Sequence, residues 1–243
     1  MKAVERPTFE SETSKRIYEY VERHGTANRH ALRDALSLSA ETFQDHLERL
    51  TSEGYLESEG GTLRIALEFG AIEEFETDGT TVIIRPGRQS DFEGLVETIR
   101  DVTAEETYVV AETVAEQLLY EDAVTRHNAV ESRVFFVATV DGAVVGWTHL
   151  DLPHLDQVKE TARQTVGVRE TYRGKGIGSE LLERGLEWAR ANGYRKVYNS
   201  IPTTNDRALE FLTEHGWNTE AIRRNHYTID GEHVDEVMMA YEF

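Results

Sequence analysis

The first quarter of the chain shows apolar residues at helical spacing, followed by a short alternating pattern. Three helical stretches are expected; the first ends at His24-Gly25, and the third begins after the N-cap candidate Ser39. Two β-prone runs then flank the turn Glu59-Gly60-Gly61, which indicates a hairpin. The pattern predicts a compact unit of three helices and a β-hairpin between about Ser11 and Leu67.

Beyond residue 80, strands alternate with helices. The polar stretch before this point suggests an N-terminal domain at 1–72, a linker at 73–80 and a second domain at 81–243. The second domain is expected to contain strands at 81–85, 134–140, 143–150, 165–168, 196–201, 223–229 and 234–241, and helices near 92–102, 105–123, 177–191 and 205–215.

The net charge of the chain indicates the salt conditions in which the protein is soluble. Aspartate and glutamate number 45 against 26 lysines and arginines, for a formal net charge of −19, and only five of the basic residues are lysine. An acidic, lysine-poor chain suits a protein kept soluble at high salt, where screening weakens self-repulsion. We therefore expect a halophilic protein, with an ordinary acidic cytoplasmic protein as the alternative.

The absence of certain residue types and segments excludes several kinds of site and cellular location. The chain has no cysteine, which excludes disulfides, thiolate metal sites and a cysteine nucleophile. The N-terminus is polar and charged, unlike a signal peptide, and apolar runs such as Val134–Ala138 are too short to cross a bilayer. We expect a soluble cytoplasmic protein with no membrane partner.

The densest chemical signal is a glycine turn at Arg173–Gly178, between a β-branched run and a helical pattern. Strand, glycine turn and helix together aim backbone N–H groups at one point, which suits a phosphate-bearing ligand. A purely structural turn is the simplest alternative. The spacing matches neither the dinucleotide fingerprint G-x-G-x-x-G nor the P-loop G-x-x-x-x-G-K-[ST].

The glycine turn resembles the acyl-CoA motif R/Q-x-x-G-x-G/A of the Gcn5-related N-acetyltransferase (GNAT) family. A second block, Asn205 to Trp217, reads N-x-x-A-x-x-F-x-x-x-x-G-W and is similar to the family's later cofactor-side helix. The order of strands from Thr81 to Phe243, with Gly146 in the third strand, fits as well. The resemblance implies an α+β fold with a mixed, mostly antiparallel central sheet flanked by helices.

The same resemblance implies acetyl-CoA as cosubstrate and direct attack of an acceptor amine on the thioester. No metal is expected, because the histidines lack the spacing of metal ligands. The strand at 166–168 would splay from the next one at 198–201 to admit the pantetheine arm. A backbone N–H near Val168 would stabilise the oxyanion. The cofactor-binding residues that it implies are Val166, Val168, Arg173, Gly174, Lys175, Gly176, Ile177, Gly178, Ser179 and Asn205.

The proton transfers are less well defined. Many members of the family carry a tyrosine acid where this chain has Leu212, and a glutamate base where residues 161–165 hold no carboxylate. An amine nucleophile is mostly protonated at neutral pH, so a group must accept its proton. Candidates for these roles are His149, Asp151 and Tyr198, with Tyr227 as a further substitute. A base acting through water, or positioning alone, is the alternative.

The N-terminal unit resembles a winged helix-turn-helix, on the phrase LERLTSEGYLESEGGTLRI. This implies a DNA or protein partner through residues 11–67. Residues 1–78 hold nine lysines and arginines against seventeen acids, which weakens DNA binding relative to docking or homodimerisation. Two functions follow: an N-acetyltransferase with an accessory winged helix, or a DNA-binding regulator whose GNAT-like domain senses acyl-CoA or an amine.

Overall fold

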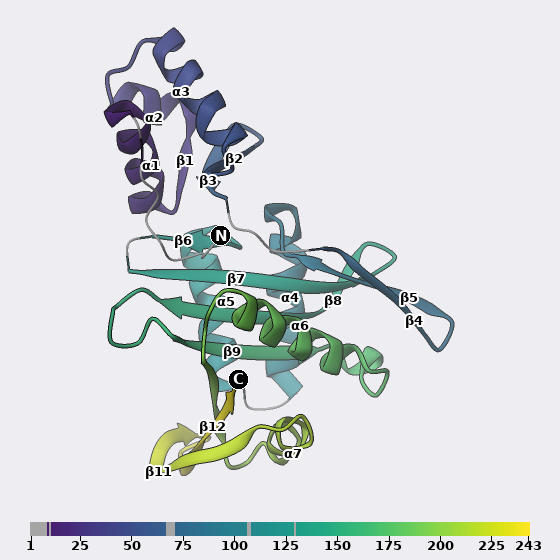
Figure 1. Ribbon diagram of the computed structural model, residues 1–243. Coiled ribbons are helices and arrows are strands. Elements are labelled where there is room, and N and C mark those ends of the chain that lie inside the picture. Colours follow the sequence, from purple (N-terminus) through teal and green to yellow (C-terminus); the bar gives the residue numbers. More distant parts are fainter. Residues whose placement is uncertain (1–8, 10, 67–70, 106–107, 129) are drawn as a thin grey trace. The chain divides into compact units, whose positions relative to one another are not determined.

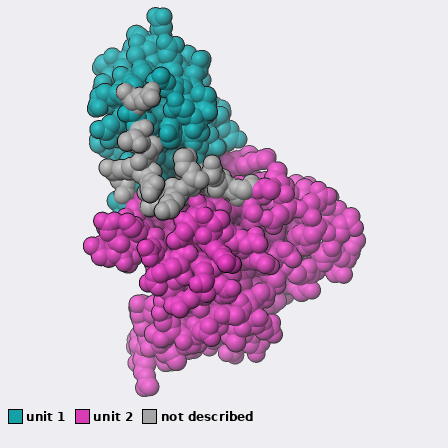
Figure 2. Space-filling model, in the orientation of Figure 1, with its two compact units in different colours: residues 1–69, 126–132 teal, residues 70–125, 133–243 magenta. Residues whose placement is uncertain are grey.

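The computed structural model describes residues 9, 11–66, 71–105, 108–128 and 130–243. The chain divides into two compact units, which Figure 2 colours separately. The first contains residues 1–69 and 126–132, and the second contains residues 70–125 and 133–243.

The first unit has the three helices and the hairpin predicted from the pattern. The helices are α1 (Glu12–His24), α2 (Arg29–Ala35) and α3 (Ala40–Ser52), and the strands are β1 (Thr26–Asn28), β2 (Leu56–Glu59) and β3 (Thr62–Ile65). Ser11, Asn28 and Ser39 each cap the helix that follows with a side-chain oxygen, which satisfies free N–H groups of its first turn. The strands pair in the order β1-β3-β2, so the hairpin gains a short third strand that the sequence pattern did not predict.

The second unit is built on a mixed sheet in the order β11-β12-β10-β9-β8-β7-β5-β4, with β6 paired to β7 off this path (Figure 1). Its strands are β4 (Glu73–Thr77), β5 (Thr80–Pro86), β7 (Glu131–Val140), β8 (Ala143–Pro153), β9 (Thr161–Val168), β10 (Lys196–Pro202), β11 (Asn218–Ile229) and β12 (Glu232–Glu242). β6 (Arg126–His127) and the first two residues of β7 fall within the first unit. β9 and β10 pair in parallel, whereas β4–β5, β5–β7, β8–β9, β10–β12 and β11–β12 are antiparallel. The predicted mostly antiparallel α+β fold is therefore confirmed.

Helices cover both faces of this sheet. They are α4 (Phe92–Glu105), α5 (Val109–Glu121), α6 (Ile177–Ala191) and α7 (Asp206–Glu214), with short 3₁₀ turns η1 (Gln89–Asp91) and η2 (Glu170–Tyr172). Successive side chains of β8 point to opposite faces of the sheet. Trp147 is fully buried in the core formed with α4 and α5, whereas its neighbour Gly146 faces Leu181 of α6.

The linker expected at residues 73–80 is instead strand β4 and its turn into β5. Asp78 and Gly79 both have positive φ (51° and 72°), as a tight hairpin turn requires. The glutamates that made this stretch look like a linker suit a partly exposed strand at the edge of a sheet.

Candidate active site

The glycine turn forms an open helix N-terminus. Gly174 and Gly176 have φ of 74° and 82°, in the left-handed region that favours glycine, and Gly176 is the N-cap residue of α6. Among the described residues, no side chain caps this helix, in contrast to the capped α1, α2 and α3. A Cβ built on either glycine meets no described atom within 4 Å. The N–H groups of the first turn are thus left to an external acceptor.

β9 and β10 separate next to this turn. Their parallel pairing ends at Tyr198 opposite Arg163. Beyond that point, residues 165–168 of β9 and 199–202 of β10 line a cavity of about 440 Å³ that is open to solvent. The splayed strands that the resemblance implied are therefore present, with the cavity between them.

Eight of the ten predicted cofactor-binding residues line the cavity: Val166, Val168, Arg173, Gly174, Gly176, Gly178, Ser179 and Asn205. The other two do not line it. Ile177 is buried, and the Lys175 ammonium lies 5.7 Å from the ring centroid of Tyr172. Asn205 is buried and caps α7, with its Oδ1 accepting from the Ala208 N–H at 3.0 Å.

Several cavity residues were not predicted from the sequence. Tyr108 and Val109, at the start of α5, lie on its wall. His215 also lines it and contacts the Ser179 hydroxyl through Nε2 at 2.8 Å. Leu212, at the position where the resemblance implies a tyrosine, is buried and lines the wall without a polar group.

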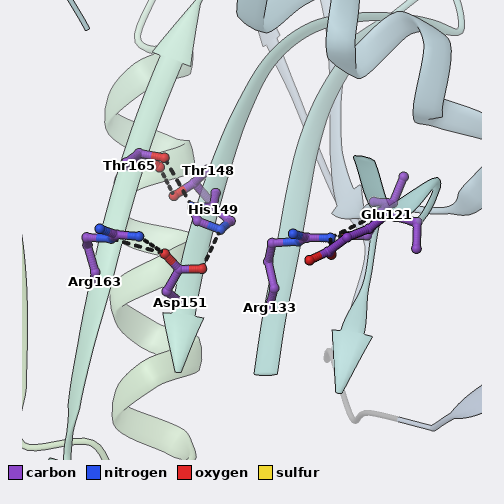
Figure 3. A network of polar contacts seen from close by, with 9 residues as sticks. Glu121, Arg133, Thr148, His149, Asp151, Arg163 and Thr165 are labelled. Carbon is purple, nitrogen blue, oxygen red and sulfur yellow. Dashed lines mark hydrogen bonds and ion pairs between the residues drawn. The ribbon is translucent and has the colours of Figure 1, made fainter. Parts of the chain in front are cut away.

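His149, Asp151 and Arg163 form one polar network on β8 and β9 (Figure 3). His149 Nε2 lies 3.0 Å from one carboxylate oxygen of Asp151, and Arg163 Nε donates to the other at 3.0 Å. On its opposite side, His149 Nδ1 lies 3.4 Å from the Oγ1 of Thr165, which lines the cavity. The network thus reaches the cavity through a threonine hydroxyl.

Electrostatics favour the ionised form of Asp151. Burial alone would raise the pKa of this carboxyl, but His149 and Arg163 oppose burial through charge and hydrogen bonds. Together they hold the pKa of Asp151 well below its usual range. His149 itself is fully buried, with its ring 4.7 Å from that of Phe135. The imidazole thus lies in the core of the sheet, and the Asp151 carboxylate is partly exposed.

The two tyrosine candidates lie elsewhere. Tyr198 stands at the last position of β10 that pairs with β9, and it does not line the cavity. Tyr227 donates from its hydroxyl to buried Glu236 at 2.9 Å, and Glu236 also pairs with Arg223 at 3.0 Å. Burial and this hydrogen bond raise the pKa of Tyr227, so the phenol stays protonated at neutral pH.

Two negative findings apply to the part of the chain that the structure describes. No group of three or more histidine, aspartate or glutamate side chains there could hold a metal ion. No helix in these residues is long and apolar enough to cross a membrane.

A mixed sheet that opens between two parallel strands, beside an uncapped helix N-terminus, is the architecture expected of a transferase that uses a coenzyme A thioester. The acetyltransferase (GNAT) family model matches residues 96–217, just over half of the chain. The chain therefore belongs to the GNAT family. A winged helix-turn-helix DNA-binding model matches residues 10–57.

Individual relatives agree with this assignment. The chain is 32% identical over 90 residues to the N-alpha-acetyltransferase RimI of Mycobacterium tuberculosis, covering 37% of this chain and 55% of that protein. It is 28% identical over 93 residues to an uncharacterized N-acetyltransferase of Methanocaldococcus jannaschii, covering 36% of this chain and 40% of that one. The chain thus spans about half the length of these relatives.

Among solved structures, the fold is similar to that of yncA, a putative acetyltransferase from Salmonella typhimurium solved with its cofactor acetyl-CoA. The TM-score is 0.53 at 20% identity, and the match covers 66% of this chain and 93% of that one.

Proposed function

We propose that this protein is an N-acetyltransferase that transfers the acetyl group of acetyl-CoA to an amine of its acceptor by direct attack. The observation that carries the proposal is the N-terminus of α6: its N-cap residue, Gly176, lines the cavity between β9 and β10, and no described side chain caps its N–H groups. Family membership supports the same reading.

The residues present suit acetyl-CoA. The N–H groups at the start of α6 would bind the pyrophosphate, because a helix N-terminus carries partial positive charge. Glycines at 174 and 176 leave room for the phosphates to approach the backbone. The gap between Val166–Val168 and 199–202 would hold the pantetheine arm, with Asn205 beside it.

In the reaction, the amine nitrogen bonds to the thioester carbon, the carbon–sulfur bond breaks, and CoA leaves as a thiolate that takes up a proton. The acceptor must first lose a proton, since a lysine-like amine has a pKa of about 10.4 and is mostly protonated at neutral pH. An N–H of β9 near Val168 would stabilise the oxyanion.

We assign the proton acceptor to His149, acting through Thr165. A proton acceptor must be neutral, and in the neutral tautomer with the proton on Nε2, 3.0 Å from Asp151, the imidazole would present Nδ1 as an acceptor toward the Thr165 hydroxyl. Arg163 holds Asp151 in place. Residues 161–165 hold no carboxylate of their own, and Asp151 comes to this strand from β8, opposite Arg163. Tyr198, the third candidate, stays a prediction.

The experiment compares His149→Gln and Thr165→Val with Tyr198→Phe, measuring CoA release against pH. A lost general base lowers kcat by roughly 10²-fold or more. We expect this loss in the first two variants, with the KM for acetyl-CoA little changed. A loss confined to Tyr198→Phe would transfer the role to that tyrosine.

A second candidate function is DNA binding by the first unit, which the match at 10–57 favours. The charges there oppose it. Arg33 pairs with Asp34, Arg49 with Glu53, and Arg64 with two glutamates of β2. Because phosphate contacts supply most non-specific affinity, arginines neutralised in this way add little.

A gel-shift series with the chain's own upstream DNA at several salt concentrations tests this candidate. Sequence-specific retardation would support the regulator, and no retardation at any salt would leave docking or homodimerisation as the role of residues 11–67. A cytoplasmic location and adaptation to high salt stay predictions.

A further inference from the structure

The hairpin of β4 and β5 reaches the glycine turn. The Thr77 hydroxyl, at the end of β4, donates to the backbone carbonyl of Lys175 at 3.0 Å. These two residues are 98 positions apart in the chain, so the contact depends on the folded sheet. β4 also lies outside residues 96–217, which the family model matches.

The start of β4 contacts α6, the helix that follows the glycine turn. Arg184 of α6 is buried and donates to Glu73 at 2.6 Å and to the Ala71 carbonyl at 2.8 Å. Its guanidinium also lies 4.8 Å from the ring centroid of Phe136. One short edge strand is thus attached to both the glycine turn and α6.

The Thr77 contact fixes the carbonyl of the peptide bond that carries the Gly176 N–H. The peptide bond between Lys175 and Gly176 is planar and trans, so its carbonyl and its N–H point in opposite directions. When Thr77 holds the carbonyl, the Gly176 N–H is directed to the opposite side of the turn. Gly176 lines the cavity, and its flexible backbone needs such a restraint.

We propose that Thr77 is a positioning residue for acetyl-CoA, which orients the glycine turn through the Lys175 carbonyl, with Glu73 anchoring α6 through Arg184. This rests on the proposed function, because it takes the glycine turn as the pyrophosphate site. Thr77 makes no contact with the cofactor in this account; it lowers the cost of ordering the turn when CoA binds.

The test uses the full chain and measures the Kd for CoA by calorimetry in four proteins: unaltered, Thr77→Val, Thr77→Ser and Thr81→Val. Thr77→Val keeps the shape but removes the donor, and Thr77→Ser keeps a hydroxyl. Thr81 is exposed on β5 of the same hairpin and provides the matched control. One hydrogen bond corresponds to about a threefold to tenfold change in Kd.

We expect Thr77→Val to raise the Kd by about that factor, while Thr77→Ser and Thr81→Val bind like the unaltered protein. Amide hydrogen exchange should rise at 174–178 in Thr77→Val alone, which a general loss of stability would not produce. Equal Kd values for Thr77→Val and Thr81→Val would overturn this inference and leave the proposed function standing. Failure of the unaltered chain to bind CoA would overturn both.

Discussion

Gly176→Ala is the sharpest single perturbation of the glycine turn. Gly176 has φ of 82°, where an alanine costs about 1–2 kcal/mol. Its Cβ would meet no described atom within 4 Å, so the cost comes from the backbone and not from a clash with the protein. The methyl group would instead occupy the open space in which the account places the pyrophosphate.

The size of the effect on binding follows from this strain. If the free turn relaxes to relieve it, CoA binding must restore the strained conformation, and the affinity falls by the same free energy. At about 1.4 kcal/mol per tenfold, 1–2 kcal/mol corresponds to a Kd raised about fivefold to thirtyfold. The methyl group adds to this loss.

Gly193→Ala is the matched control. Gly193 has φ of 85° and an equally open Cβ position, but it follows the other end of α6, about 22 Å away along the helix axis. Urea unfolding should show similar losses of stability in both variants. Calorimetry with CoA should show weaker binding only in Gly176→Ala. Equal affinities in the two variants would refute the assignment of the turn.

Three further changes test other parts of the account. Gly167→Ala places a Cβ in steric overlap with the Trp147 ring, so urea unfolding should show a loss of about 1–3 kcal/mol from overpacking; an unchanged midpoint would contradict the packing. The lowered pKa of Asp151 means that its ionised form stabilises the fold above about pH 4 and that this contribution is lost as pH falls further. Asp151→Asn should therefore be less stable than the unaltered protein at pH 7, and the difference in unfolding free energy should shrink toward pH 3. Asn205→Ala should lower the free energy of unfolding by about 1 kcal/mol through loss of the α7 cap, and it should also raise the KM for acetyl-CoA. A change in stability with an unchanged KM would show that Asn205 has no role in cofactor binding.

The fold, and the grouping of most candidate cofactor residues around one cavity, could be predicted from the sequence because their signals are local; that these residues bind acetyl-CoA stays a prediction. The glycine turn, the apolar face of α6 and the block from Asn205 to Trp217 each lie within one short segment. Eight of the ten predicted cofactor residues line the cavity for this reason.

The proton-transfer network could be predicted only as separate candidates. His149 and Asp151 stand out as polar residues on a strand, but their connection to Thr165 and Arg163 depends on the β8–β9 register across a long loop. A shift of one residue in that register would turn these side chains to opposite faces. Similarly, the composition of β4 predicts a linker, because the edge position that tolerates its glutamates is not visible in the sequence.

Amine-dependent acetyl transfer is the claim on which the account depends most. The direct measurement incubates the purified chain at high salt with isotopically labelled acetyl-CoA and a panel of small amines, polyamines and peptides. Free CoA thiol and labelled N-acetyl product are then quantified together. The account predicts equimolar formation of both with at least one amine, and loss of both in Gly176→Ala at limiting acetyl-CoA. Tight binding of acetyl-CoA without amine-dependent release of CoA across the panel would contradict it and favour the acyl-CoA sensor.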